Sequence, residues 1–378
     1  MEYLNTRTTI LGFIGLFLLV EANAAPNVTA VQGTFQSGQM LTISGSGFGS
    51  KNQAAPLVWD DFEGGASGQS IAGNRPAAES LDGDWTWDDY TNGVGPRYSN
   101  ELTMPNSAMS SKHHFSGDGY NNSLEIYHDV RETGDAVYFS FYYYYDRLND
   151  IWSRNHKPWV VYGNTGYYPS AYIGAGNPTE SDGTFRNSVQ DSGIDADILW
   201  GNISISDLAG EWVRHEFYLQ QSSPNGNDGV WQHTAHRVTQ PEIITVEDED
   251  NYKTRATSDY WEQWHFGSYH STSSTGSIAD VYLDNIYFDS TRARVEIGNA
   301  STWGNSTVRE LQVANTWSDT SIRINIESSY LRNLSEVYVY VVDANGDVNS
   351  TGYPVSVSND SNIQSPPRPP RNLSITIE

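Results

Sequence analysis

The chain has 378 residues, with 46 acidic against 21 basic side chains and a formal net charge of −25 at pH 7. This balance disfavours nucleic acid and anionic membranes as partners, because phosphate binding needs clustered Lys and Arg. It also disfavours a highly anionic glycan unless basic residues gather locally. There is no cysteine, which excludes disulfides and thiolate metal sites, so core packing must hold the fold together.

The N-terminus has the pattern of a secretory signal. A short start with one Arg precedes an apolar run from Ile10 to Val20, and Ala22-Asn23-Ala24 matches an A-x-A cleavage site. The run is too short to cross a bilayer comfortably, and no later segment is a better candidate. We expect a signal peptide over residues 1–24 and a secreted or extracellular protein without membrane insertion. The periplasm and the cell surface both remain open.

The next segment, residues 25–55, has a strand pattern whose continuation lies far away in the chain. The stretch from Gly38 to Gly49 follows the pattern G-x-x-(V/L)-T-I-x-G-x-x-F-G and resembles the opening strands of an IPT/TIG immunoglobulin-like domain. Two later runs, Trp317–Ile326 and Val337–Gly346, resemble its closing strands, and Asn345-Gly346 is a strong hairpin signal.

These runs predict an immunoglobulin-like domain in two parts, residues 25–55 and 292–360, interrupted by a larger domain over residues 56–291. Insertion at a loop tip is tolerated because the ends of an inserted domain usually lie close together. Two ordinary small domains flanking a central one are the alternative. The Pro-rich tail over residues 361–378 is expected to be an extended linker or a disordered end.

The central region consists of short alternating runs separated by turn residues, which predicts an all-β sandwich. We find no convincing helix of three turns in the mature chain. The predicted strands include Val137–Tyr145, Trp159–Tyr162, Trp212–Leu219, Gly229–Val238 and Val281–Phe288.

Three short patterns in this region resemble the concanavalin A-like jelly roll, a superfamily of glycan-binding modules and alginate-lyase-like polysaccharide lyases. They are Asp61-Phe62-Glu63, Glu211–Arg214 and Val281–Ile286. The resemblance implies a jelly-roll β-sandwich. It also implies a structural calcium shared by Glu63 and Asp284, since calcium prefers several oxygen ligands. Ordinary carboxylates that cap turns explain the same two residues.

The run Trp261–His270 is the predicted cleft strand. At strand period, Gln263, His265, Gly267 and Tyr269 share one face, while Trp264 and Phe266 share the other. The late strand of the jelly-roll lyases often carries K-x-G-x-Y, and here His265 replaces the Lys. By that resemblance Tyr269 transfers protons during β-elimination, with His265 beside it. The Arg-rich R-x-E-x-R strand of alginate lyases is absent.

Other residues are candidates for contacts with a glycan. Plausible partners for a carboxylate lie in the basic stretch that contains Arg154, Asn155 and Lys157, and Arg255 and Gln263 add to them. Aromatic side chains stack on the apolar faces of sugars. The stacking candidates are Trp159, Tyr167 and Tyr168.

The sequence therefore predicts a jelly-roll β-sandwich inserted in, or flanked by, an immunoglobulin-like sandwich, with a polysaccharide on its concave sheet. Binding without chemistry is the first interpretation. A polysaccharide lyase that acts by β-elimination on a uronate-containing glycan is the second, and a structural or adhesive surface protein is the third. The identity of the glycan and the oligomeric state are left open.

Overall fold

The computed structural model describes residues 24–79, 84–89, 95–116, 122–145, 155–175, 184–191, 194–208, 210–271, 278–327 and 330–358. Over these residues the chain is all-β, as predicted. Its helices are single 3₁₀ turns, at Val130–Thr133, Ile205–Leu208, Trp303–Asn305 and Leu331–Asn333. Within the described ranges, no helix has both the length and the apolar character needed to cross a membrane. The predicted signal peptide and Pro-rich tail fall almost entirely outside these ranges.

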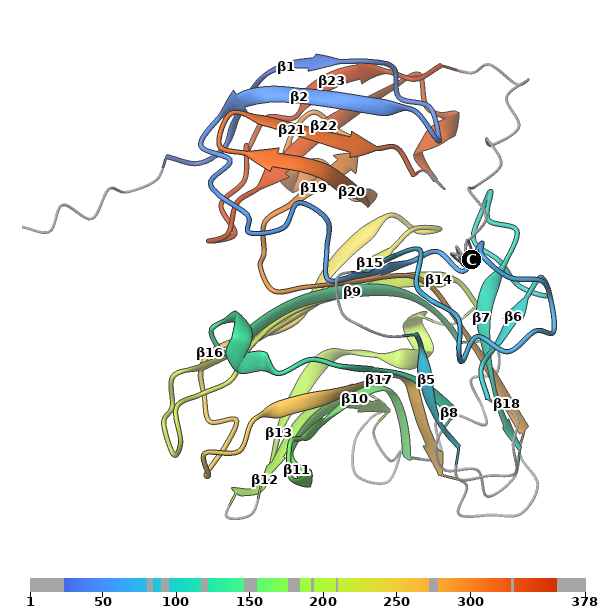
Figure 1. The fold of residues 1–378 in the computed structure, drawn as a ribbon, viewed down its shortest axis with the longest axis vertical. Helices are drawn as coiled ribbons and strands as arrows, with labels where there is room; N and C mark the ends of the chain where they lie inside the picture. Colours follow the sequence, from blue (N-terminus) through green and yellow to red (C-terminus); the bar gives the residue numbers. More distant parts are fainter. Residues whose placement is uncertain are drawn as a thin grey trace, which may run out of the picture.

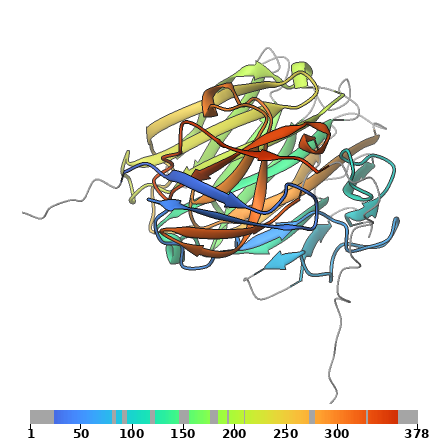
Figure 2. The same cartoon turned by 90° about the horizontal axis from the view of Figure 1, so that it is seen from above.

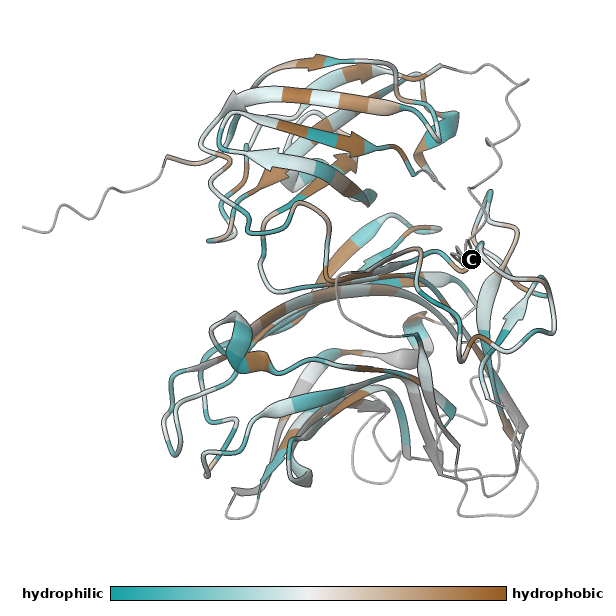
Figure 3. Ribbon diagram, viewed as in Figure 1, coloured by the Kyte–Doolittle hydropathy of each residue, from teal (hydrophilic) through white to brown (hydrophobic). Residues whose placement is uncertain are grey.

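One unit, here called the terminal domain, is built from both ends of the chain. Its strands follow the spatial order β1 (Asn27–Gln32), β2 (Met40–Ser46), β21 (Ser321–Asn325), β20 (Arg309–Ser318), β19 (Arg294–Gly298), β22 (Glu336–Val342) and β23 (Tyr353–Ser356). Hydrophobic and hydrophilic residues follow one another along these strands (Figure 3). Leu41 and Ile43 of β2 are fully buried, and their backbones pair with Ile324 and Ile322 of β21. The immunoglobulin-like family assignment of this unit stays a prediction.

The intervening region forms a β-sandwich of two antiparallel sheets (Figure 1). The back sheet lies next to the terminal domain. Its strands follow the order β16 (Glu242–Tyr252), β15 (Gly229–Arg237), β14 (Trp212–Gln220), β9 (Ala136–Tyr145), β18 (Ile278–Asp289), β3 (Val58–Asp60) and β4 (Ala78–Glu79). In addition, β7 (Ser110–Ser116) pairs with β18, and β6 (Arg97–Ser99) pairs with β7. The front sheet lies on the far side, in the order β13 (Ile194–Ser204), β12 (Thr184–Asp191), β11 (Gly166–Ala175), β10 (Asn155–Gly163), β17 (Trp261–Ser271), β8 (Asn122–Tyr127) and β5 (Thr86–Asp89).

Aromatic side chains fill the space between the two sheets. Phe139 of the back sheet packs against Trp159 of the front sheet at a ring-centroid distance of 5.0 Å, and against Trp264 at 5.8 Å. Trp159 also stacks on Trp231, 5.8 Å away. A large aromatic side chain buries roughly 150–250 Å², so this layer stabilises the packing of the two sheets. It also fixes which residues of the front sheet point away from the core.

The terminal domain is fastened onto the back sheet by buried charges, and Figure 2 shows it stacked over the sandwich. Arg214 lies 2.7 Å from Glu216 and 3.0 Å from Glu296, while Arg294 lies 3.0 Å from Glu216 and 2.6 Å from Glu296. Arg214 and Glu216 belong to β14 of the back sheet, and Arg294 and Glu296 belong to β19 of the terminal domain. Each side of the domain boundary therefore contributes one positive and one negative charge. Burial alone would raise the pKa of Glu296, but the charges of Arg214 and Arg294 outweigh burial and lower it to about 2. Four mutually paired charges fix the orientation of the domains, because removing one leaves others buried and unpaired.

Candidate functional site

The face of the front sheet that points away from the core is here called the outer face. Along β17, Trp264 and Phe266 enter the core, so strand alternation places Gln263 and His265 on the outer face. This is the division predicted from the sequence. On β11, Ala171 and Ile173 enter the core, and Tyr172 therefore points outward.

A polar cluster lies on the outer face where β10, β11 and β12 run side by side. The Lys157 Nζ sits 4.6 Å from the centre of the Tyr172 ring. The Tyr172 hydroxyl oxygen accepts hydrogen bonds from Arg186 Nη2 at 2.8 Å and from Gln190 Nε2 at 3.2 Å. Burial, together with the charge of Arg186, lowers the pKa of Lys157 to about 8. A substantial share of Lys157 is therefore a neutral amine at mildly alkaline pH, able to accept a proton.

His265 occupies the next position across the face. Its Nδ1 lies 3.1 Å from Ser123 Oγ and 3.2 Å from a carboxylate oxygen of Glu125. Burial lowers the pKa of His265 to about 3, so the ring is neutral and the contact with Glu125 is a hydrogen bond rather than an ion pair. Its Nε2 is buried and has no hydrogen-bond partner among the described residues. The Tyr162 ring packs edge-on against His265 at 4.9 Å.

Exposed tyrosines gather at one end of this face. Tyr127, Tyr167 and Tyr168 are 55, 49 and 43% exposed, and Met40 is the one other large apolar side chain classed as exposed among the described residues. In the sheet, the backbone of Gln263 lies opposite Tyr127 on one side and Tyr162 on the other. The centre of the Tyr162 ring lies 5.4 Å from that of Tyr167. The Tyr167 hydroxyl donates to Gln190 Oε1 at 3.0 Å, which joins this end to the polar cluster. Exposed rings beside hydrogen-bonding groups are typical of sugar-binding surfaces.

The structure brings together several of the predicted glycan contacts. Lys157, Gln263, His265 and Tyr167 lie on the outer face, and Tyr168 follows Tyr167 at the exposed start of β11. The backbone of Tyr269 pairs directly with that of Lys157, but the side chains of Tyr269 and Asn155 lie outside what the structure describes. Arg154 lies outside the described residues altogether.

Two predicted contacts are in the wrong place for binding. Trp159 is 1% exposed and packs in the aromatic core, because β10 turns it toward the back sheet. Arg255 is 7% exposed, and its Nε donates to the Ser222 carbonyl at 2.6 Å. This bond fastens the 221–228 loop, so Arg255 has a structural role.

Backbone geometry alone explains the glycine at position 267, without any appeal to the K-x-G-x-Y pattern. Its φ is 71°, and a Cβ there would collide with the imidazole of His113. The pairing of β10 with β17 shifts by one residue between Lys157 and Trp159. Glycine is therefore required for a bulge at a close approach, whatever the chemistry of the face.

Four residues of the outer face were not predicted from the sequence: Tyr172, Arg186, Gln190 and Glu125. The signal for Tyr172 was present, since Ser170, Tyr172 and Gly174 alternate with Ala171 and Ile173. Arg186 and Gln190 gave no such signal, because they meet Tyr172 only through the pairing of β11 with β12.

The two carboxylates expected to share calcium do lie together. The Ser107 hydroxyl is 2.5 Å from Glu63 Oε1 and 3.3 Å from Asp284 Oδ2. Burial, Asp61 and Glu63 raise the pKa of Asp284 well above its usual range. However, Glu63 Oε1 also accepts from the backbone N–H groups of Ala108 and Met109, so hydrogen-bond donors crowd the oxygen that a cation would need. Nowhere in the described ranges do three or more His, Asp or Glu side chains form a metal-binding group. The calcium expectation stays a prediction.

Comparison with known proteins finds likeness in fold alone. No protein-family model and no curated protein matches the chain. Among solved structures, the PL-14 alginate lyase from Aplysia kurodai aligns at 11% identity and a TM-score of 0.39, covering 51% of this chain and 86% of that one. Alginate lyase vAL-1 from Chlorella virus aligns at 12% and 0.36, covering 54% and 92%. A GH131 β-glucanase catalytic domain from Podospora anserina aligns at 14% and 0.38, covering 62% and 95%. All three TM-scores lie below 0.5, so a functional assignment has to rest on this chain's own residues.

Proposed function

We propose that the outer face binds a uronate-containing polysaccharide and cleaves it by β-elimination. The observation that carries the proposal is the Lys157 amine, with its lowered pKa, over the ring of Tyr172, whose hydroxyl accepts two hydrogen bonds. The sequence favoured binding without chemistry because the Arg-rich R-x-E-x-R strand is absent and the net charge of −25 opposes a polyuronate ligand. Lys157 and Tyr172 offer a base next to a tyrosine that the sequence did not reveal.

The local charge suits an acidic sugar despite the net charge of −25. Arg186 and Lys157 both approach the Tyr172 ring, at 5.5 and 4.6 Å from its centre, so a permanent cation and a titratable amine face one spot. A carboxylate bound there would gain from the charge of Arg186, because water is partly excluded at this buried position, while Lys157 in its neutral form stays available as a base.

The proposed reaction divides into a base step and an acid step. Neutral Lys157 removes the C5 proton next to the sugar carboxylate, and Arg186 stabilises the negative charge that develops on that carboxylate. The electron pair then forms the C4–C5 double bond as the bond from C4 to the glycosidic oxygen breaks. Tyr172 gives its proton to the leaving oxygen. Since its own oxygen already accepts from Arg186 and Gln190, the phenolate that remains is stabilised by hydrogen bonds.

The test is an absorbance assay on alginate, glucuronan, pectate and ulvan-type polysaccharides, with the new double bond read at about 235 nm. We expect one of them to give a steady rise. Lys157→Arg keeps the positive charge but removes the base, and Tyr172→Phe removes the acid, so each is expected to lower kcat by about 10²–10⁴-fold. Lys253→Arg, at a lysine whose Nζ donates to Asn225 Oδ1 in a surface loop, is the matched control and should retain activity. No signal on any of these substrates would refute cleavage.

Binding without cleavage is the second candidate, and the exposed Tyr127, Tyr167 and Tyr168 favour it. These rings would stack on sugars whether or not the chain is cut. In that case a glycan array would retain the protein, Tyr167→Ala would abolish retention, and Lys157→Arg would produce no loss of binding and no change in absorbance.

A further inference from the structure

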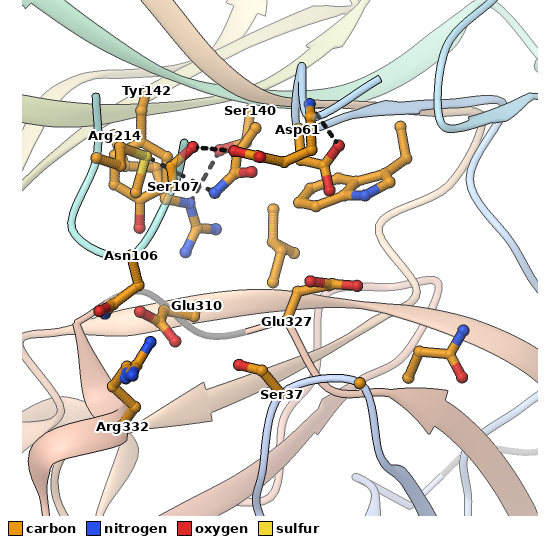
Figure 4. Close-up of a pocket in the computed structure, with 17 residues that line it drawn as sticks. Ser37, Asp61, Asn106, Ser107, Ser140, Tyr142, Arg214, Glu310, Glu327 and Arg332 are labelled. Atoms are coloured by element: carbon orange, nitrogen blue, oxygen red, sulfur yellow. Dashed lines mark hydrogen bonds between the residues drawn. The ribbon is translucent and has the colours of Figure 1, made fainter. Parts of the chain in front are cut away.

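A second site lies at the boundary between the sandwich and the terminal domain. A partly open cavity of ≈ 540 Å³ is lined there by residues of both units, and its volume is within the range of small-molecule sites. The back sheet contributes Tyr142 and Ser140, and the terminal domain contributes Glu310 and Glu327 (Figure 4). The cavity lies on the opposite side of the sandwich from the outer face, so it is not part of the proposed lyase site.

The lining is acidic. Asp61, Glu63, Glu310 and Glu327 line the cavity, against the cations Arg214 and Arg332. The charge of Arg214 is already balanced, because its guanidinium pairs with Glu216 and Glu296, neither of which lines the cavity. An organic anion would therefore be repelled, and a cation would be attracted.

Tyr142 is the residue that points to a ligand. It is 4% exposed, and its hydroxyl has no hydrogen-bond partner among the described residues. Figure 4 shows this hydroxyl directed into the cavity, toward the side of Glu310 and Asn106. Burial raises the pKa of Tyr142, so the group keeps its proton at neutral pH. A buried hydroxyl without a partner is costly, which is explained if a bound molecule supplies the missing hydrogen bond.

The remaining lining is suited to a molecule with several polar groups. The ring of Trp59, together with that of Tyr142, provides aromatic surface, and Ser37, Ser107 and Asn106 provide hydroxyl and amide groups. Aromatic faces also attract organic cations.

From this geometry we propose that the interdomain cavity binds a small organic amine that carries further hydrogen-bonding groups. The carboxylates hold the ammonium group, and the Tyr142 hydroxyl bonds a polar atom of the same molecule. The domain boundary is thus a ligand site in its own right, with a charge preference opposite to that of the outer face.

The experiment is isothermal titration calorimetry on the full chain with two amines, glucosamine and spermidine, and with glucose, glucuronate and CaCl₂ as comparisons. We expect saturable binding of at least one amine, with glucosamine alone indicating an amino sugar and spermidine alone a polyamine. Tyr142→Phe removes one hydrogen bond and should weaken binding by about three- to tenfold. Glu310→Gln removes a charge but keeps an acceptor for the Tyr330 N–H, and should weaken it by roughly 10- to 100-fold.

Matched controls separate this site from the outer face. Tyr218→Phe changes a half-buried tyrosine of the same back sheet that does not line the cavity, and it should leave binding of the amine unaltered. Lys157→Arg should also leave it unaltered, so failure here would not touch the cleavage proposal. The proposal is overturned if neither amine binds, if glucose or glucuronate binds as tightly, if only calcium binds, or if both cavity variants bind like the wild type.

Discussion

Six buried histidines make the folded chain sensitive to acid. Burial lowers the pKa of His113, His128 and His236 to about 4 and that of His215 and His265 to about 3, and it holds the pKa of His233 well below its usual range. In the unfolded chain each has a pKa near 6.5. As the pH falls below that value, the unfolded chain takes up protons that the folded chain does not, so stability is lost.

The size of the effect follows from the number of protons. Each histidine costs ~1.4 kcal/mol per pH unit once its unfolded form is protonated, so six give roughly 8 kcal/mol per unit near pH 5. Burial raises the pKa of Asp284 and Asp289, and these two groups act in the opposite direction, so the net slope near pH 5 lies between roughly 5 and 8 kcal/mol per unit. Because a domain is stable by only about 5–15 kcal/mol, we expect unfolding between about pH 6 and pH 4.

Urea unfolding followed by tryptophan fluorescence at several values between about pH 7.5 and pH 5.5 measures this slope. His128→Gln should lower it by about one proton, or ~1.4 kcal/mol per pH unit. His114→Gln is the matched control, since the His114 side chain is 39% exposed. A free energy of unfolding that stays constant over this interval would refute the reasoning, as would equal slopes for wild type and His128→Gln.

Four further outcomes follow from the structure. If Lys157 is the base, kcat/KM should rise about tenfold per pH unit below pH ~8 and level off above it, as its pKa of about 8 requires, and a flat profile would contradict this role. Arg214→Met should lower the free energy of unfolding, measured by chemical denaturation, by about 3–5 kcal/mol, because Glu296 loses a partner. A change below about 1 kcal/mol would show that the charges are not coupled across the domain boundary. If Glu63 holds calcium, EDTA should lower Tm and Glu63→Gln should abolish the difference, and an unchanged Tm would exclude a structural calcium. Tyr127→Ala should raise KM with little change in kcat if the ring only stacks on sugar, and a selective loss of kcat would place it in the chemistry instead.

The strand pattern was readable from the sequence because alternation and turn residues are local signals. Trp264 and Phe266 enter the core and His265 faces outward, as the run Trp261–His270 predicted. Trp159 was misplaced because an aromatic residue in a strand has the same appearance on either face. Only the partner strand decides which way it points.

The candidate site was harder to predict because its members are distant in sequence. Lys157, Tyr172 and Arg186 come from three strands, and their approach depends on sheet order and on the one-residue shift between β10 and β17. No local pattern encodes that shift. The cavity depends on the pairing of β2 with β21, in which Leu41 lies opposite Ile324, 283 positions later in the chain. No local pattern connects segments so far apart.

Cleavage by β-elimination is best tested by mass spectrometry of the oligosaccharides that the purified chain releases from a uronate polysaccharide. β-Elimination predicts products that are one water molecule lighter at the new non-reducing end, formed by the wild type and lost with Lys157→Arg. Hydrolytic products of full mass, or intact polymer with the wild-type protein, would contradict β-elimination by this protein.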